Sequence, residues 1–189
     1  GFNFGQARFR IRGYDSENTL VSINGVMVND LETGWASWSN WAGLNDVTRW
    51  MQVRSGTGPS RFNFGGIGGY TEINVRPSDL RKGLRVSYAS ANRAYRNRIM
   101  ATYNTGMQAN GWAFSLSGSR RWADEGYIDG TSFDAWAYFA AAEKKINDRH
   151  TISFSGFGAP IIQGRQGLAT QEAYDLAGTN FYNPNWGYQ

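Results

Sequence analysis

The sequence predicts a protein dominated by β-strands, and three observations favour this fold class. Aromatic residues make up 15% of the 189 residues, 24 residues are glycine, and charged residues reach only 18%. Disordered chains are poor in aromatic residues, and the strong helix formers are outnumbered here by Gly, Ser, Asn and aromatic residues. Long runs alternate between apolar and polar residues, which is the two-residue period of a strand with one buried face.

The first part of the chain, to about residue 77, contains short strand patterns separated by turn signals. Strands are expected at residues 8–13, 19–26, 47–56 and 70–75. Asn24-Gly25 is a dipeptide typical of tight hairpin turns. Residues 58–69 read as a glycine-rich turn, where the clustered glycines permit positive φ and close packing. These patterns predict a small unit rich in turns.

Three tryptophans follow the second strand pattern at a regular spacing. Trp35, Trp38 and Trp41 lie three residues apart in the segment Leu31–Gly43. This spacing fits one face of a helical turn, or a loop that presents its aromatic side chains.

The pattern changes near Leu80, where long alternating runs begin. Strands are expected at residues 83–91, 97–106, 112–122, 132–146 and 150–158. The clearest run is "WAFSLSGSRRW", in which Trp112, Phe114 and Leu116 face one way. Its opposite face carries the polar residues Ser115, Ser117, Ser119 and Arg121. These runs have about the 9–11 residues that a tilted strand needs to cross a bilayer.

The connections between these runs are expected to alternate between short and long. Residues 105–111 and 145–149 read as short turns, whereas residues 123–132 and the segment after residue 160 read as longer loops. Membrane barrels have this asymmetry, and their hydrated interior suits small polar side chains. A soluble β-sandwich, which also alternates with one solvated face, remains the alternative from the pattern alone.

The opening stretch "FRIRGYDSENTLVSINGVMVND" resembles the plug of TonB-dependent outer-membrane receptors, in which an "IRG" strand precedes a strand similar to "LVLIDGVPVN". Ile11-Arg12-Gly13 match the first element, and residues 20–29 match the second. Asn24 stands where the family pattern usually has Asp.

A second stretch, "WMQVRSGTGPSRFNFGGIGGYTEINV", resembles the next element of the same family, "IEVLRGPSSALYGSGAIGGVINI". The matching residues are Arg54, Gly58-Pro59-Ser60, Gly65, Ile67-Gly68-Gly69 and Ile73-Asn74-Val75. The segment "RSGTGPS" is an insertion relative to the compact family motif. Residues 112–160 look like the first barrel strands of such receptors from Bacteroidota-type bacteria.

The resemblance implies a plug domain at residues 1–78, followed at residues 79–189 by the start of a 22-stranded antiparallel transmembrane β-barrel. About five barrel strands would be present, and both domains would be incomplete at the chain ends. It also implies a multi-pass protein of the Gram-negative outer membrane, in contact with its lipids. The expected function is import of a bulky nutrient (siderophore, oligosaccharide or peptide) driven by the TonB complex, which binds a segment before the plug. A surface lipoprotein lid is a further implied partner.

Candidate site residues fall into two groups. Ligand contacts are expected from Trp35, Trp38, Trp41 and Asn63, with residues 164–189 as a roof over the site. Contacts between plug and barrel wall are expected from Arg10, Arg12 and Arg54. The tryptophans could instead pack their loop onto the plug, and the arginines could be solvated charges at strand edges.

Several function classes find no support in the sequence. The chain has no cysteine and one histidine, His150, so we expect no metal site, no cofactor and no enzymatic activity. The net charge of +4 is scattered, so no nucleic-acid partner is expected. No signal peptide and no apolar run of a membrane-spanning helix are recognised, and both ends resemble cuts in a longer protein. A secreted carbohydrate-binding β-module and a passive structural outer-membrane barrel remain alternatives.

Overall fold

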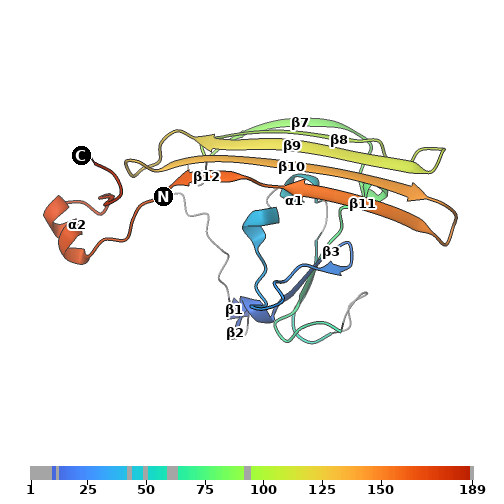
Figure 1. Ribbon diagram of the computed structural model, residues 1–189, viewed down its shortest axis with the longest axis horizontal. Coiled ribbons are helices and arrows are strands. Elements are labelled where there is room, and N and C mark those ends of the chain that lie inside the picture. The colour runs from blue at the N-terminus through green and yellow to red at the C-terminus, as the bar shows by residue number, and fades with distance from the viewer. Residues whose placement is uncertain are drawn as a thin grey trace.

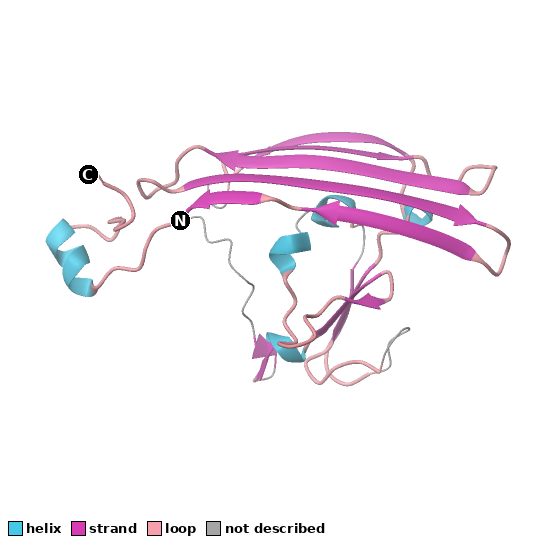
Figure 2. Cartoon of the chain, viewed as in Figure 1, coloured by secondary structure: helices cyan, strands magenta, loops and turns pink. Residues whose placement is uncertain are grey.

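The computed structural model describes residues 10–11, 13–41, 44–48, 51–58, 64–91 and 95–187. Strands dominate this part of the chain, as the sequence predicts. They form a broad antiparallel sheet, called here the large sheet, and a smaller unit from residues 10–79, called here the N-terminal lobe. The lobe lies against one face of the large sheet, below its middle in Figures 1 and 2.

The N-terminal lobe is built around a four-stranded sheet in the order β4-β3-β6-β5. Its strands are β3 (Leu20–Ile23), β4 (Val26–Met27), β5 (Met51–Arg54) and β6 (Tyr70–Ile73). β3 and β6 are parallel, and the other pairs are antiparallel. A separate two-stranded ladder joins β1 (Arg10–Ile11) to β2 (Tyr14–Asp15).

The predicted turn at Asn24-Gly25 is confirmed. Asn24 has φ 51° and Gly25 has φ 87°, so both central residues of the hairpin adopt the left-handed conformation that this turn type requires. The Asn24 side chain also accepts a hydrogen bond from the Val75 backbone N–H at 2.9 Å. This residue therefore closes the turn and ties it to the segment that follows β6.

Short helices connect the strands of the lobe. They are η1 (Ser16–Asn18), η2 (Trp38–Trp41), α1 (Leu44–Val47) and η3 (Pro77–Asp79). The strand expected at residues 47–56 begins only at Met51, so this boundary was wrong. Leu44 and Val47 are both buried, and their spacing of three residues suits one face of a helical turn rather than a strand.

The large sheet contains the five long strands that the sequence predicts. They are β7 (Gly83–Ser90), β8 (Asn97–Asn104), β9 (Trp112–Ala123), β10 (Ser132–Lys145) and β11 (Thr151–Gly158), in the order β11-β10-β9-β8-β7. A further strand, β12 (Ile161–Gly164), pairs with the first part of β10. Helix α2 (Gln171–Ala177) lies beyond that end of the sheet (Figure 1).

Strand β12 was expected to be loop. β10 is longer than β11, so its first residues leave an edge on which the returning chain can pair. Pro160 interrupts this edge because it has no N–H to donate, yet its carbonyl accepts from the Trp136 N–H at 3.0 Å. The chain therefore continues along β10 after a break at the proline.

An apolar cluster joins the lobe to the large sheet. Its buried members are Val21, Ile23, Leu44, Val47, Ile73 and Val75 of the lobe with Phe139 and Ala141 of β10. The sequence predicts polar contacts from arginines at this boundary, and the structure shows an apolar cluster there. The inward face of β10 carries Phe139 among alanines, which gives the lobe an apolar surface to pack on.

Candidate functional site

The large sheet exposes an apolar face to its surroundings. This outward face carries Leu84, Val86, Tyr88, Ile99, Tyr103, Trp112, Phe114, Leu116, Trp136, Tyr138, Ile152 and Phe154. Their exposed fractions range from 38% at Trp112 to 74% at Phe154. Contiguous apolar patches are uncommon on the surface of soluble monomers and mark interaction or membrane surfaces.

Strand register places these side chains on one face. Leu84 lies opposite Tyr103, Tyr103 opposite Leu116, and Leu116 opposite Ala140. Residues that lie opposite each other in neighbouring strands point to the same side of a sheet. The row therefore extends across four strands without a charged side chain.

The other face of the sheet, against which the lobe lies, is polar and small along β9, whereas β10 contributes apolar residues such as Phe139. Ser115, Ser119 and Thr102 are buried there, with 0%, 4% and 6% of their surface exposed. The Thr102 and Ser117 hydroxyls are 2.8 Å apart, and Ser115 donates to the Asn104 side chain. A soluble protein buries its apolar residues and exposes its polar ones. In β9 this arrangement is inverted, because Phe114 and Leu116 are exposed whereas Ser115 and Ser119 are buried.

Charged and aromatic side chains bound the outward face at both ends of β9. At one end Arg120 forms a two-point ion pair with Asp134, at 3.0 and 2.9 Å, and its guanidinium lies 5.2 Å from the ring centres of both Trp122 and Trp136.

At the other end of the face, Lys144 lies 5.1 Å from the Trp112 ring centre. Its ammonium group also donates to the Asn110 carbonyl at 2.6 Å. Cations and tryptophans therefore occur together at both borders of the apolar face, and tryptophan is typical of membrane interfaces.

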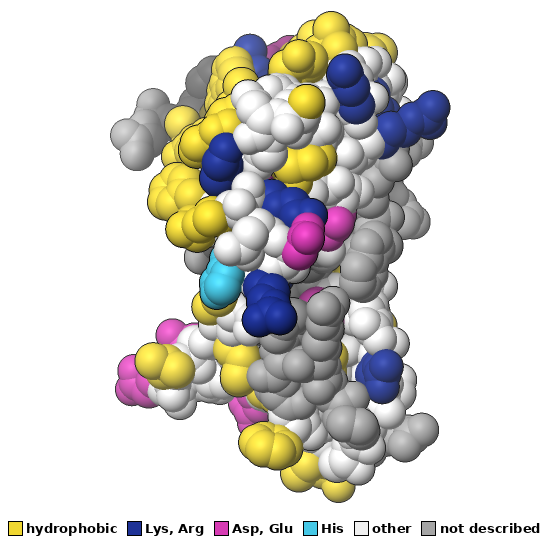
Figure 3. Space-filling model, turned by 90° about the vertical axis from the view of Figure 1, so that its right-hand side faces the viewer, with side chains coloured by type: hydrophobic (Ala, Val, Ile, Leu, Met, Phe, Trp, Pro, Cys, Tyr) yellow, Lys and Arg dark blue, Asp and Glu magenta, His cyan; other side chains and the backbone are white. Residues whose placement is uncertain are grey.

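The two ends of the sheet differ less in connection length than we expected. Turns 105–111 and 146–150 lie at one end, which Figure 3 views, with hydrophobic side chains along one flank and Lys and Arg side chains over the end itself. The connection 124–131 at the opposite end is only one residue longer than 105–111, because β9 continues one residue past its expected end, through Ala123. The long segment is the one after β12.

Residues 165–187 fold onto the 124–131 connection. Asn183 is buried, its amide donates to the Asp129 carbonyl at 2.8 Å, and its oxygen accepts from the N–H groups of Gly167 and Asn185. Trp186 packs over Gly130, where an added Cβ would lie 2.5 Å from the indole ring. This segment, predicted as a roof, is thus held against the 124–131 connection by the contacts of Asn183 and Trp186.

The three tryptophans predicted as ligand contacts are half-buried in the lobe. Trp38 and Trp41 meet edge to face at 5.6 Å and pack against the apolar cluster. The Trp35 indole donates to Glu17 at 3.2 Å. These contacts agree with the packing alternative and leave part of each ring accessible. Asn63 lies outside the described residues.

The loop that carries Trp35 is fixed by two side chains that sequence reasoning missed. The Asn29 amide donates to the carbonyls of Thr19 and Gly34, and its oxygen accepts from the Val21 N–H at 2.8 Å. Asp30 accepts from the Thr33 N–H at 2.7 Å and also from the Thr33 hydroxyl. Both hydrogen bonds lower the pKa of the Asp30 carboxyl. The only sequence signal for the role of Asn29 and Asp30 was their position shortly after a strand.

The arginines predicted to contact the sheet are only partly described. Arg54 is exposed on β5, an edge strand of the small sheet. Arg12 and the Arg10 side chain lie outside the described residues.

Sequence reasoning missed a different polar contact between the lobe and the large sheet. The buried Glu143 of β10 accepts from the Ser78 hydroxyl at 2.8 Å and from the Ser78 N–H at 3.3 Å. The signal was a carboxylate on the otherwise apolar inward face of β10.

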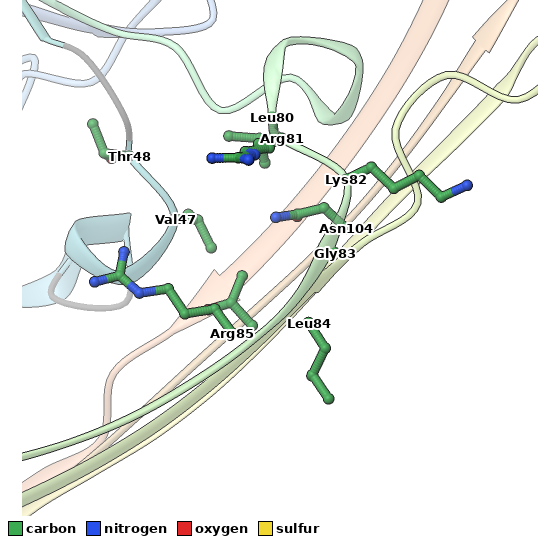
Figure 4. A pocket seen from close by; sticks show the side chains of 10 residues that line it. Val47, Thr48, Leu80, Arg81, Lys82, Gly83, Leu84, Arg85 and Asn104 are labelled. Atoms are coloured by element: carbon green, nitrogen blue, oxygen red, sulfur yellow. The ribbon is translucent and has the colours of Figure 1, made fainter.

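A cavity of about 480 Å³ separates α1 from the first residues of β7. Val47 and Thr48 line one side, and the other side is basic (Figure 4). Arg81, Arg85 and Asn104 point into it. The lobe is therefore packed tightly at the apolar cluster and loosely beside β7.

A scan against models of protein families and a search of curated proteins both find no match for this chain. Within the described ranges, no helix is long and apolar enough to span a membrane. The same part of the chain contains no group of three or more His, Cys, Asp or Glu side chains placed to hold a metal ion.

Proposed function

We propose that the chain is the plug and the first barrel strands of a TonB-dependent receptor that imports a bulky nutrient across the outer membrane. The observation that carries the proposal is the exposed apolar face of the large sheet, combined with buried Ser and Thr side chains on the opposite side of β8 and β9. A sheet between lipid and a hydrated interior needs an apolar outer face and polar groups on its inner face. In this proposal residues 1–78 are the plug and residues 79–189 begin a 22-stranded barrel.

The spacing of the two bordering belts supports a membrane location. Trp112 and Trp122 are ten residues apart in β9, which corresponds to about 33 Å at about 3.3 Å per residue. With a strand tilt of about 40°, the distance along the membrane normal is about 25 Å, the height of the apolar band in membrane barrels.

The contacts of the N-terminal lobe support its role as a movable plug. The apolar cluster and the Ser78–Glu143 contact hold it against the wall, while the cavity beside β7 leaves one side loosely packed. In the proposed mechanism the TonB complex pulls on a segment before the plug and opens a path along the polar face. A lipoprotein lid would act at the opposite end, near residues 165–187.

The alternatives account less well for the same observations. A secreted carbohydrate-binding module would leave the whole outward face in water, and such patches favour association. A passive barrel has no need of a lobe that covers its polar face. Both alternatives predict that the lobe has no influence on ion flow across a membrane.

Ion conductance of the full-length protein in a planar lipid bilayer tests the proposal without knowledge of the nutrient. We expect low conductance while the lobe is folded, and a large reversible increase when urea unfolds the lobe but not the barrel. Thr48 and Arg85 line opposite sides of the same cavity, and the chain has no native cysteine. Bridging Thr48→Cys to Arg85→Cys with a reducible bis-maleimide should keep the channel closed in urea.

Two controls make this result specific. Reducing the linker should restore opening, and either single cysteine variant treated in the same way should open like the wild type. A protein that does not insert into bilayers, or one whose conductance ignores the state of the lobe, would contradict the proposal.

A further inference from the structure

A shallow groove of about 410 Å³ interrupts the outward face of the large sheet. Its floor consists of the small residues Ala101, Gly118 and Ala140, and larger side chains stand around it. The bordering side chains are those of Leu84, Tyr103, Leu116 and Tyr138. The groove is therefore apolar, and backbone forms part of its floor because Gly118 has no side chain.

Register places the groove next to the Arg120–Asp134 pair. Gly118 and Arg120 are two residues apart on the same face of β9, and they lie opposite Tyr138 and Trp136 of β10. Two residues of a strand correspond to about 6.6 Å. An elongated amphiphile can thus place its tail in the groove and its polar end at Arg120.

The charged end has hydrogen-bonding capacity left for a ligand. The ion pair uses Nε and Nη2 of Arg120, so the N–H donors of Nη1 are not needed for it. The side chains of both partners are partly exposed, at 39% and 38%. A guanidinium between two indole rings is held in place, and its planar donor set suits phosphate oxygens.

We propose that this groove binds one lipid molecule that carries a phosphate in its head group, with an acyl chain over Gly118 and the phosphate at Arg120. The inference rests on the proposed function, because it requires the outward face to contact lipid. The order in which the cation, the tryptophans and the groove follow one another on the sheet supports a lipid as the occupant. The cation and the tryptophans lie at the border of the apolar face, and the groove begins on its apolar side.

Lipid retention by the full-length protein, measured by native mass spectrometry, tests the groove. The probes are phosphatidylglycerol and a digalactosyl diacylglycerol with the same acyl chains. Gly118→Leu fills the groove, and a Cβ at this position meets no atom within 4 Å, so the variant is expected to fold. Gly156→Leu is the matched control, because its Cβ also meets open space and Gly156 does not line the groove.

We expect Gly118→Leu to weaken phosphatidylglycerol binding about tenfold, which equals about 1.4 kcal/mol, and Gly156→Leu to leave it unchanged. The wild type should prefer phosphatidylglycerol to the galactolipid, and Arg120→Gln should remove that preference. Equal retention by both glycine variants, or equal retention of the two lipids by the wild type, would overturn the inference. If the protein inserts into bilayers but shows either of these overturning results, the lipid site is refuted and the proposed function is not. If the protein fails to insert, the proposed function is refuted.

Discussion

At the scale of single residues, Leu116 and Ser117 are adjacent in β9 but face opposite sides of the large sheet. Leu116 lies four residues from both Trp112 and Arg120, in the middle of the apolar face. We expect Leu116→Arg to reduce the free energy of unfolding in bilayers by about 2–4 kcal/mol, because its charge would lie near the midplane. In Ser117→Arg the new side chain would point to the polar side, so the free energy of unfolding should fall by less. Urea titrations in lipid vesicles measure both, and the reverse order would mean that the assigned faces are exchanged.

Trp38 distinguishes a packing role from a ligand role in the lobe. Its ring packs against the apolar cluster and against Trp41. We expect Trp38→Ala to destabilise the lobe by about 3 kcal/mol, at the low end for a large aromatic residue because the ring is only half-buried. Urea-induced conductance would then begin at a lower urea concentration. An unchanged opening midpoint would speak against packing and leave ligand contact as the role of Trp38.

At the scale of elements, the segment after β12 should owe its order to Asn183. Replacing Asn183 with alanine removes three part-buried hydrogen bonds and leaves their backbone groups without this partner. The expected cost is about 1–3 kcal/mol, confined to this segment. Hydrogen exchange of residues 165–187 should accelerate while β9 and β10 stay protected. Asn180→Ala, at an exposed position of the same segment, is the control and should exchange like the wild type.

Elements with a strict alternation were predictable, and those that depend on distant partners were not. β9 alternates over its whole length, so its location and its facing followed from local sequence. β12 forms only because β10 offers an unpaired edge, and α1 forms where Leu44 and Val47 meet the apolar cluster. The candidate site divides in the same way. The apolar face could be predicted from the alternation, whereas the Ser78–Glu143 contact joins residues too far apart in the chain.

At the scale of the whole molecule, the contact between Ser78 and Glu143 should help to keep the lobe against the sheet. Glu143→Ala leaves the Ser78 donors without their acceptor at the start of the connection to β7. We expect the lobe to release at a lower urea concentration in the conductance experiment. Lys145→Ala is the control, because Lys145 pairs with Asp148 of the adjacent turn. Equal midpoints for the two variants would show that the contact does not restrain the lobe.

The proposed function requires that the outward face of the large sheet contacts lipid and that the opposite face does not. Spin labels at single cysteines from Trp112 to Arg121 in the bilayer-embedded full-length protein test it directly, through their collision rates with oxygen and with a water-soluble nickel chelate. We expect a two-residue period, with oxygen collisions highest at the even-numbered positions, a maximum near Leu116 and a decline toward Trp112 and Arg120. Higher nickel than oxygen accessibility at Phe114, Leu116 and Gly118, or no period at all, would contradict it.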